Sequence, residues 1–154
     1  MASTDSNETI IYNSLFRHGV DEKRRVQIPA KWRPSQPEVE FTLIPWPNGD
    51  QPDAYLLVLP PAVMKVIMDK ITPMSSADPK TSALRRLIGS RSANVTVDKS
   101  GRICLPEAMA QTVGIKTEAV LVGSLDRFEI WSPERYDAVS AADSALLSEA
   151  FKLI

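Results

Sequence analysis

Residues 97–106 read Val97-Asp98-Lys99-Ser100-Gly101-Arg102-Ile103-Cys104-Leu105-Pro106, which predicts a strand, a tight turn, a second strand and a proline that opens a helix. Asp98 can accept hydrogen bonds from nearby backbone, and Gly101 tolerates a positive φ, so both favour the turn. Ile103 and Leu105 alternate with other residues at the period of two that is typical of a half-buried strand. Asp98 and Arg102 therefore flank the tip of a predicted hairpin.

The same arrangement occurs at residues 20–29, which read Val20-Asp21-Glu22-Lys23-Arg24-Arg25-Val26-Gln27-Ile28-Pro29. Asp21 aligns with Asp98, and Arg25 with Arg102, at a constant offset of 77 residues. The pattern predicts a duplicated unit, each half containing a β-hairpin, a short helix, a second β-hairpin and a long helix. The first half is longer, and we place its extra residues around 45–53.

The organisation of the chain follows from this duplication. We expect a disordered tail over residues 1–13, a first repeat over 14–76, a linking helix over 77–93, a second repeat over 94–140 and the end of the C-terminal helix over 141–154. Within the repeats the sequence predicts strands over 11–20, 25–28, 41–44, 55–59, 94–97, 102–105, 119–122 and 127–131, a turn over 45–50, and helices over 61–71, from 79 to about 91, over 106–112 and from 133. Asp78 is the expected N-cap of the second long helix, and Trp131 is expected in the core.

Composition limits the function classes. The chain has 154 residues, of which 44% are hydrophobic and 24% charged, as in an ordinary soluble protein. No run approaches the roughly 18 apolar residues of a membrane span, and the polar N-terminus is unlike a secretory signal. We therefore expect a cytoplasmic protein with no membrane partner. The net charge of −1 does not exclude nucleic acid, because acids elsewhere can offset a basic patch.

Catalytic and metal-binding residue types are scarce. Cys104 is the single cysteine, and its place on an apolar strand pattern predicts a small core residue. His18 is the single histidine, which leaves neither a Cys/His pair nor a zinc cluster. We expect no enzyme activity, no cofactor and no small-molecule substrate.

Local charge around the first turn predicts contact with nucleic acid. Six cations and two acids lie between Arg17 and Arg33, a local charge of +4. A two-stranded ribbon can enter the major groove of DNA, where arginine reads guanine with two hydrogen bonds. An aspartate beside such an arginine can cap the turn, orient the guanidinium or accept from cytosine, and we favour the first two roles.

A purely structural interpretation stays open, since an Asp and an Arg at a turn often form only a solvated ion pair worth roughly 0–1 kcal/mol. Two copies in register favour the functional interpretation. The predicted DNA-contacting residues are Asp21, Lys23, Arg24, Arg25, Asp98, Lys99 and Arg102.

The chain resembles the MraZ family of the SpoVT/AbrB-like superfamily over about residues 14–140. Residues 97–106, 120–131 and 21–33 carry the resemblance. It implies a mostly β fold with helices (α+β), a duplicated swapped-hairpin barrel with two pseudo-symmetric halves in one domain. Arg24 departs from the family pattern, which has glycine there, so its turn is expected to differ or to be strained.

The resemblance also implies a function. A member would be a sequence-specific DNA-binding transcriptional regulator, a repressor at the promoter of the division and cell-wall gene cluster, associated with the nucleoid. It would act as a ring-shaped homo-oligomer, an octamer or larger, on repeated boxes in double-stranded DNA, with Asp21, Arg25, Asp98 and Arg102 as its motif residues. The alternative is a structural ring or protein-interaction scaffold without sequence-specific DNA binding.

Overall fold

A computed structural model describes residues 9–154. Its strands are β1 (Leu15–Gly19), β2 (Arg25–Gln27), β3 (Glu40–Asn48), β4 (Gln51–Leu59), β5 (Ala93–Thr96), β6 (Arg102–Cys104), β7 (Glu118–Gly123) and β8 (Phe128–Trp131). Its helices are η1 (Ala30–Trp32), α2 (Pro61–Ile71), α3 (Pro79–Arg91), α4 (Glu107–Thr112), α5 (Pro133–Ala145) and α6 (Leu147–Phe151). In this part of the chain, every helix is too short or too polar to cross a membrane.

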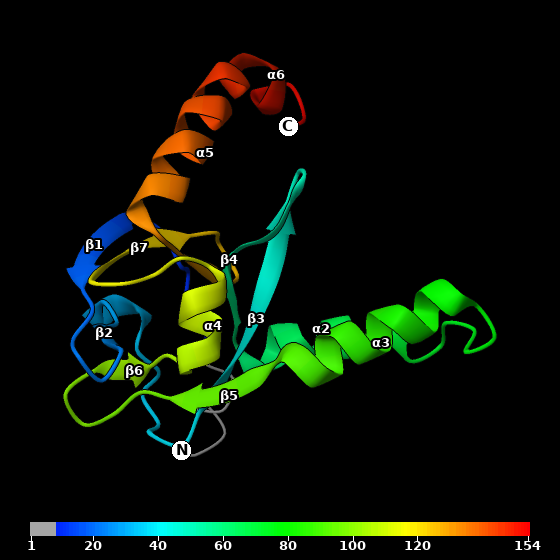
Figure 1. Ribbon diagram of the computed structural model, residues 1–154, viewed down its shortest axis with the longest axis horizontal. Helices are drawn as coiled ribbons and strands as arrows, with labels where there is room; N and C mark the ends of the chain where they lie inside the picture. Colours follow the sequence, from blue (N-terminus) through cyan, green and yellow to red (C-terminus); the bar gives the residue numbers. More distant parts are fainter. Residues whose placement is uncertain (1–8) are drawn as a thin grey trace.

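Six strands form one antiparallel sheet in the order β1-β7-β8-β4-β3-β5, and β2 pairs with β6 in a separate two-stranded ribbon (Figure 1). The order is symmetric about the β4–β8 pair. Each half supplies one inner hairpin, β3–β4 or β7–β8, and the first strand of each half, β1 or β5, pairs with the hairpin of the other half at the edge of the sheet. The ribbon likewise takes one strand from each half. This topology confirms the predicted α+β fold with two pseudo-symmetric, strand-swapped halves. The predicted boundaries of the repeats stay a prediction.

The prediction that the strands on either side of each motif turn pair with each other is wrong. Only the tips close locally: Asp21 N donates to Arg25 O at 3.1 Å, and Asp98 N donates to Arg102 O at 2.8 Å. Beyond the tips the flanking strands separate, so that β1 pairs with β7 and β5 with β3. The apolar alternation that predicts each strand is preserved, because pairing with the other half buries the same face.

Both faces of the sheet are covered. On β4, Leu56 and Val58 join the larger core cluster, which includes Val26 and Ile103 of the ribbon. The alternate residues Tyr55, Leu57 and Leu59 join a second cluster, against which residues of α2, α3 and α5 pack. This double burial explains the uninterrupted apolar run at 55–59. Trp131 is in the core, as predicted.

Helix predictions agree with the structure. The helix over 61–71 is confirmed, and the Asp78 side chain caps α3 by accepting from Lys80 N at 2.9 Å. The predicted turn over 45–50 is wrong in extent, since β3 continues to Asn48 and the turn lies at Gly49, with φ 56°. β5 pairs with β3 only at residues 40–43 of β3. Beyond residue 43 this side of β3 has no neighbouring strand, so the missing N–H groups of Pro45 and Pro47 break no hydrogen bond to β5.

The predicted tail over residues 1–13 falls partly outside the described residues, which begin at residue 9. Within the described part, Tyr12 is buried, and its N–H donates to Leu125 O at 2.8 Å. Tyr12 therefore belongs to the folded part of the chain.

Candidate nucleic-acid interface

The β2–β6 ribbon brings together the two motifs that the sequence places 77 residues apart. Arg25 is opposite Cys104, Val26 opposite Ile103, and Gln27 opposite Arg102. Val26 and Ile103 are buried beneath the ribbon, whereas Arg25, Gln27 and Arg102 keep partial exposure on the other face. The alternation of β-strand side chains thus puts both arginines on one accessible surface.

In the first motif, Asp21 organises the turn. Its Oδ1 accepts from Lys23 N at 2.9 Å and from Arg25 N at 2.8 Å. Its Oδ2 accepts from Arg25 Nε at 2.7 Å. One carboxylate therefore closes the turn and also fixes the direction of the Arg25 guanidinium, the two roles favoured from the sequence.

In the second motif, Asp98 repeats the turn closure with a looser ion pair. Its Oδ1 accepts from Ser100 N and from Arg102 N, both at 2.9 Å. Arg102 Nε lies 3.5 Å from Asp98 Oδ2. Arg102 Nη1 also lies 3.7 Å from Oδ2 of Asp21, so the second arginine is shared between the two motifs.

These contacts affect the protonation of both aspartates. The hydrogen bond from the Arg25 amide, reinforced by the Arg25 side chain, lowers the pKa of Asp21. The hydrogen bond from the Arg102 amide, together with that of Ser100, lowers the pKa of Asp98. Both carboxylates are therefore ionised at neutral pH and hold their arginines by charge-assisted contacts.

A shallow hollow of about 290 Å³ lies at the meeting point of the motifs. Its lining includes Asp21, Arg25, Gln27 and Arg102. The Nε of Arg102 is shielded from solvent and has no hydrogen-bond acceptor within the described residues. The Arg102 side chain as a whole is 30% exposed, so it is accessible at this hollow although its Nε is not.

Arg24 adopts the left-handed conformation expected for a strained turn, with φ 62°, where its counterpart Gly101 has φ 81°. Arg24 Nε donates to Leu105 O at 3.0 Å. In the other half, the equivalent carbonyl, Ile28 O, accepts from Arg33 Nε at 2.8 Å, and the Arg33 guanidinium lies over Gly101. The two halves thus fill one structural role with arginines from different sequence positions.

The remaining predicted cations divide into two groups. Lys23 and Lys99 are exposed at the tips of the two turns, next to the ribbon. Arg17 instead pairs with Asp137 of α5 at 2.7 Å, and Lys31 donates to Asn13 Oδ1 at 2.7 Å. Arg17 and Lys31 are therefore engaged by partners within the chain, whereas the exposed cations at the ribbon tips come from both halves.

The prediction that Cys104 is a core residue is wrong. Cys104 is exposed, and its thiol lies 3.2 Å from Lys23 O. Ile103 and Leu105 take the buried positions. Because side chains alternate along a strand, Cys104 lies on the opposite, accessible face together with Arg102. Gln27, which is absent from the predicted DNA-contacting residues, shares this face, and its Nε2 donates to Ser100 O at 3.2 Å. The 77-residue offset aligns Gln27 with Cys104, and this alignment could have identified both as residues of the accessible ribbon face.

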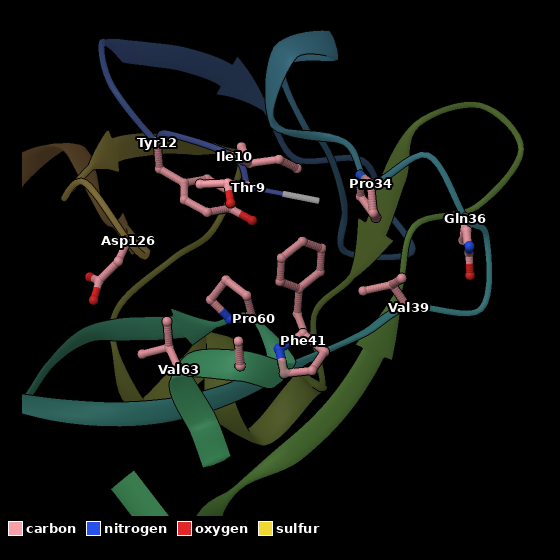
Figure 2. A pocket seen from close by; sticks show the side chains of 12 residues that line it. Thr9, Ile10, Tyr12, Pro34, Gln36, Val39, Phe41, Pro60, Val63 and Asp126 are labelled. Carbon is pink, nitrogen blue, oxygen red and sulfur yellow. The ribbon is translucent and has the colours of Figure 1, made fainter. Parts of the chain in front are cut away.

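A second hollow, of about 280 Å³, lies between the N-terminal segment, the loop before β3 with the start of that strand, and the start of α2. Figure 2 shows the rings of Tyr12, Phe41 and Pro60 around it, with Asp126 at its edge. Its lining contains an acid and no cation, so it does not share the electrostatics of the ribbon. Within residues 9–154, His, Cys, Asp and Glu side chains form no group of three or more that could hold a metal ion.

Comparison with known proteins gives a consistent result. A family model described as "MraZ protein, putative antitoxin-like" matches residues 90–152, which include the second motif. The chain is 36% identical over 132 residues to "Transcriptional regulator MraZ" of Herpetosiphon aurantiacus, covering 84% of this chain and 88% of the relative. It is 33% identical over 132 residues to the protein of the same name from Nitrosospira multiformis, covering 80% of this chain and 85% of that relative.

A third relative, "Transcriptional regulator MraZ" of Ruegeria sp., is 30% identical over 142 residues, covering 86% of this chain and 83% of the relative. These matches extend over both halves of the chain and nearly the full length of each relative. The chain belongs to the MraZ family.

Proposed function

We propose that the protein is a DNA-binding transcriptional regulator and that the β2–β6 ribbon is its DNA-contacting surface. The relatives named transcriptional regulators support the class of function. The observation that carries the site is the convergence of Arg25 and Arg102 on one partly exposed ribbon, each oriented by an aspartate of its own turn. A two-stranded ribbon of this kind fits the width of the major groove.

Each ribbon residue has a proposed role. Arg25 and Arg102 donate to guanine edges or phosphates, since a guanidinium fork suits both. Lys23 and Lys99, exposed at the turn tips, neutralise backbone phosphates, and Arg24 adds positive charge beside them. Asp21 and Asp98 hold the arginines in place, which reduces the entropy lost on binding.

Assembly extends the proposal. We infer a closed ring of identical chains, an octamer or larger, that presents several ribbons to repeated DNA boxes. Linked weak contacts raise overall affinity by about 10²–10⁴ when their spacing matches. Occupation of the promoter of the division and cell-wall gene cluster, in the nucleoid, would repress transcription.

The test is fluorescence anisotropy with a labelled duplex from the region upstream of the protein's own gene and a scrambled duplex of equal length. Arg25→Ala and Arg102→Ala are each expected to weaken binding to the upstream duplex by about 1–3 kcal/mol. Arg127→Ala is the matched control, because it removes an equal charge beside its neighbour Asp126 at the β7–β8 turn.

Wild-type affinity in both ribbon variants would contradict the site. Binding that ignores both salt concentration and DNA sequence would instead favour the protein-interaction scaffold.

A further inference from the structure

A third hollow, of about 600 Å³, lies beside the ribbon, between β1, the end of β2 and η1. We name it the β1 hollow, and its lining includes Phe16, His18, Gln27, Lys31 and Arg33. Gln27 also lines the shallow hollow where the two motifs meet. The β1 hollow is therefore continuous with the proposed DNA-contacting surface, although it lies outside both motifs.

Two aromatic rings form the apolar part of the β1 hollow. Phe16 and His18 are two residues apart on β1, so both lie on the same face of the strand. Their ring planes are within 5° of parallel, and the ring centroids are 6.2 Å apart. The Phe16 ring packs edge-on against Trp32 of η1, with centroids 5.3 Å apart, which fixes its position. Both rings stay partly exposed and present apolar surface to a ligand.

Lys31 places a positive charge over this apolar surface. Its Nζ lies 5.6 Å from the centroid of the Phe16 ring. It donates to Asn13 Oδ1 at 2.7 Å and to Ser14 Oγ at 2.8 Å. Both acceptors are neutral, so they hold the ammonium in place without cancelling its charge. An ammonium has three N–H donors, and these two bonds, counted within residues 9–154, leave one donor for an acceptor from outside the chain.

Arg33 supplies a second cation to the β1 hollow. Its Nε donates to Ile28 O at 2.8 Å, and its guanidinium lies over Gly101 in the turn of the second motif. Arg33 therefore stands between the β1 hollow and the ribbon. Among the described residues that line the hollow, none is acidic. A concave surface with cations and no acid attracts an anion.

We propose that the β1 hollow receives the sugar–phosphate backbone of the DNA strand that flanks the groove entered by the ribbon. A DNA backbone alternates apolar deoxyribose with anionic phosphate, and the hollow offers a surface for each. Lys31 and Arg33 contact the phosphate, and Phe16 and His18 pack against the sugar. Contacts of this kind fix the position and orientation of a protein on a duplex without reading its sequence. The inference rests on the proposed function and adds to it a positioning contact outside the two motifs.

Anisotropy titrations at several salt concentrations, with the upstream and the scrambled duplex, test this contact. Lys31→Gln is expected to weaken binding to both duplexes by the same factor, about two- to five-fold, the size of one exposed ion pair. It is also expected to reduce the slope of log affinity against log salt concentration by about 1, because one phosphate contact is lost. Lys65→Gln is the matched control, since Lys65 is 75% exposed on α2, away from the hollow, and it is expected to keep the wild-type affinity and slope.

Two substitutions at one position test the apolar part. His18→Ala removes one of the two rings and is expected to weaken binding to both duplexes. His18→Phe keeps a planar ring and is expected to bind like the wild type. Urea unfolding of both variants checks that they fold, so that a loss of affinity in His18→Ala reports on the contact itself.

Replacing single phosphates with neutral methylphosphonates locates the contact on the DNA. At one or two positions, neutralisation is expected to weaken binding by the wild type but not by Lys31→Gln, which has already lost the partner of that phosphate. A Lys31→Gln protein with the affinity and salt slope of the wild type would overturn the inference. So would a Lys31→Gln protein that stays sensitive to every methylphosphonate that weakens the wild type.

The ribbon variants separate the two proposals. Weaker binding by Arg25→Ala and Arg102→Ala, with wild-type binding by Lys31→Gln and His18→Ala, contradicts the backbone contact alone. Wild-type binding by both arginine variants, with weaker binding by Lys31→Gln, contradicts the assignment of the ribbon alone.

Discussion

Arg102 of the second motif lies 3.7 Å from Asp21 of the first, measured from Nη1 to Oδ2. The two residues are brought together only because β2 and β6, from opposite halves of the chain, pair with each other. The motifs therefore form one charged cluster rather than two independent fingertips. A change in either motif is expected to affect the arginine of the other.

The shared position of Asp21 predicts an effect of Asp21→Asn on both motifs. The amide keeps an oxygen that can accept from the Lys23 and Arg25 amides, but it loses the charge that holds the guanidinium groups. We expect the fold to survive and DNA affinity to fall, because Arg25 and Arg102 become less ordered before binding. Anisotropy titration measures the affinity.

Asp98→Asn is the matched variant, since among residues 9–154 the ion pair of Asp98 is with its own arginine alone. We expect Asp98→Asn to weaken binding less than Asp21→Asn. Equal losses in the two variants would contradict the shared role of Asp21.

The lowered pKa of Asp98 predicts how its contribution to stability depends on pH. Because the folded-state pKa lies below the unfolded value of about 3.9, the stabilisation is fully present above that value and is lost as pH falls through the folded pKa. We expect the wild type to be more stable than Asp98→Asn at pH 7, and the difference to shrink toward pH 3. Urea unfolding at both pH values measures this, and an equal difference at the two values would contradict it.

Gly101 provides a test of turn strain. Gly101→Ala places a Cβ against the Arg33 guanidinium at a φ of 81°, a left-handed conformation that costs a non-glycine residue about 1–2 kcal/mol. We expect a loss of at least that size in the free energy of unfolding, measured with urea. Arg33→Ala in the same chain is expected to remove the clash but not the backbone cost.

Gly89→Ala is the control for this change, because Gly89 lies within α3 and an added Cβ meets no atom within 4 Å. It is expected to stabilise the protein by about 0.5–1 kcal/mol. A Gly101→Ala protein as stable as the wild type would show that the turn does not require glycine.

Arg24 predicts the opposite balance at the equivalent turn. Arg24→Gly relieves the backbone cost at φ 62°, about 1–2 kcal/mol, but loses the hydrogen bond to Leu105 O, worth about 0.5–1.5 kcal/mol. We expect a net change in unfolding free energy between a loss of about 0.5 kcal/mol and a gain of about 1.5 kcal/mol. A large destabilisation would mean that the Arg24 side chain contributes more than this hydrogen bond.

Local signals predict the tips of the two motif turns and the helices well. Asp98 and Gly101 close the second turn as their chemistry indicates, and Pro61 and Asp78 mark where α2 and α3 begin. In each case the residues that determine the structure lie within a few positions of each other. The residues Asp21, Arg25, Asp98 and Arg102 meet in one cluster, but only their spacing within each motif could be predicted.

Strand pairing could not be predicted in the same way. The partners of β1 and β2 lie in the other half of the chain, and burial of a strand face does not specify which strand covers it. The extent of β3 was missed because Pro45 and Pro47 usually end a strand, and only the short overlap with β5 makes them acceptable. Cys104 was misplaced by residue type, although the strand period assigns it to the exposed face.

Protection of Cys104 by DNA tests the central claim most directly, because it needs no substitution. Cys104 is the single cysteine, is exposed, and lies opposite Arg25 in the ribbon. Alkylation by a thiol reagent, followed by mass spectrometry, is expected to slow markedly when the upstream duplex is added and to recover at high salt. Alkylation at the same rate with saturating duplex bound would contradict the assignment of the ribbon as the DNA-contacting surface.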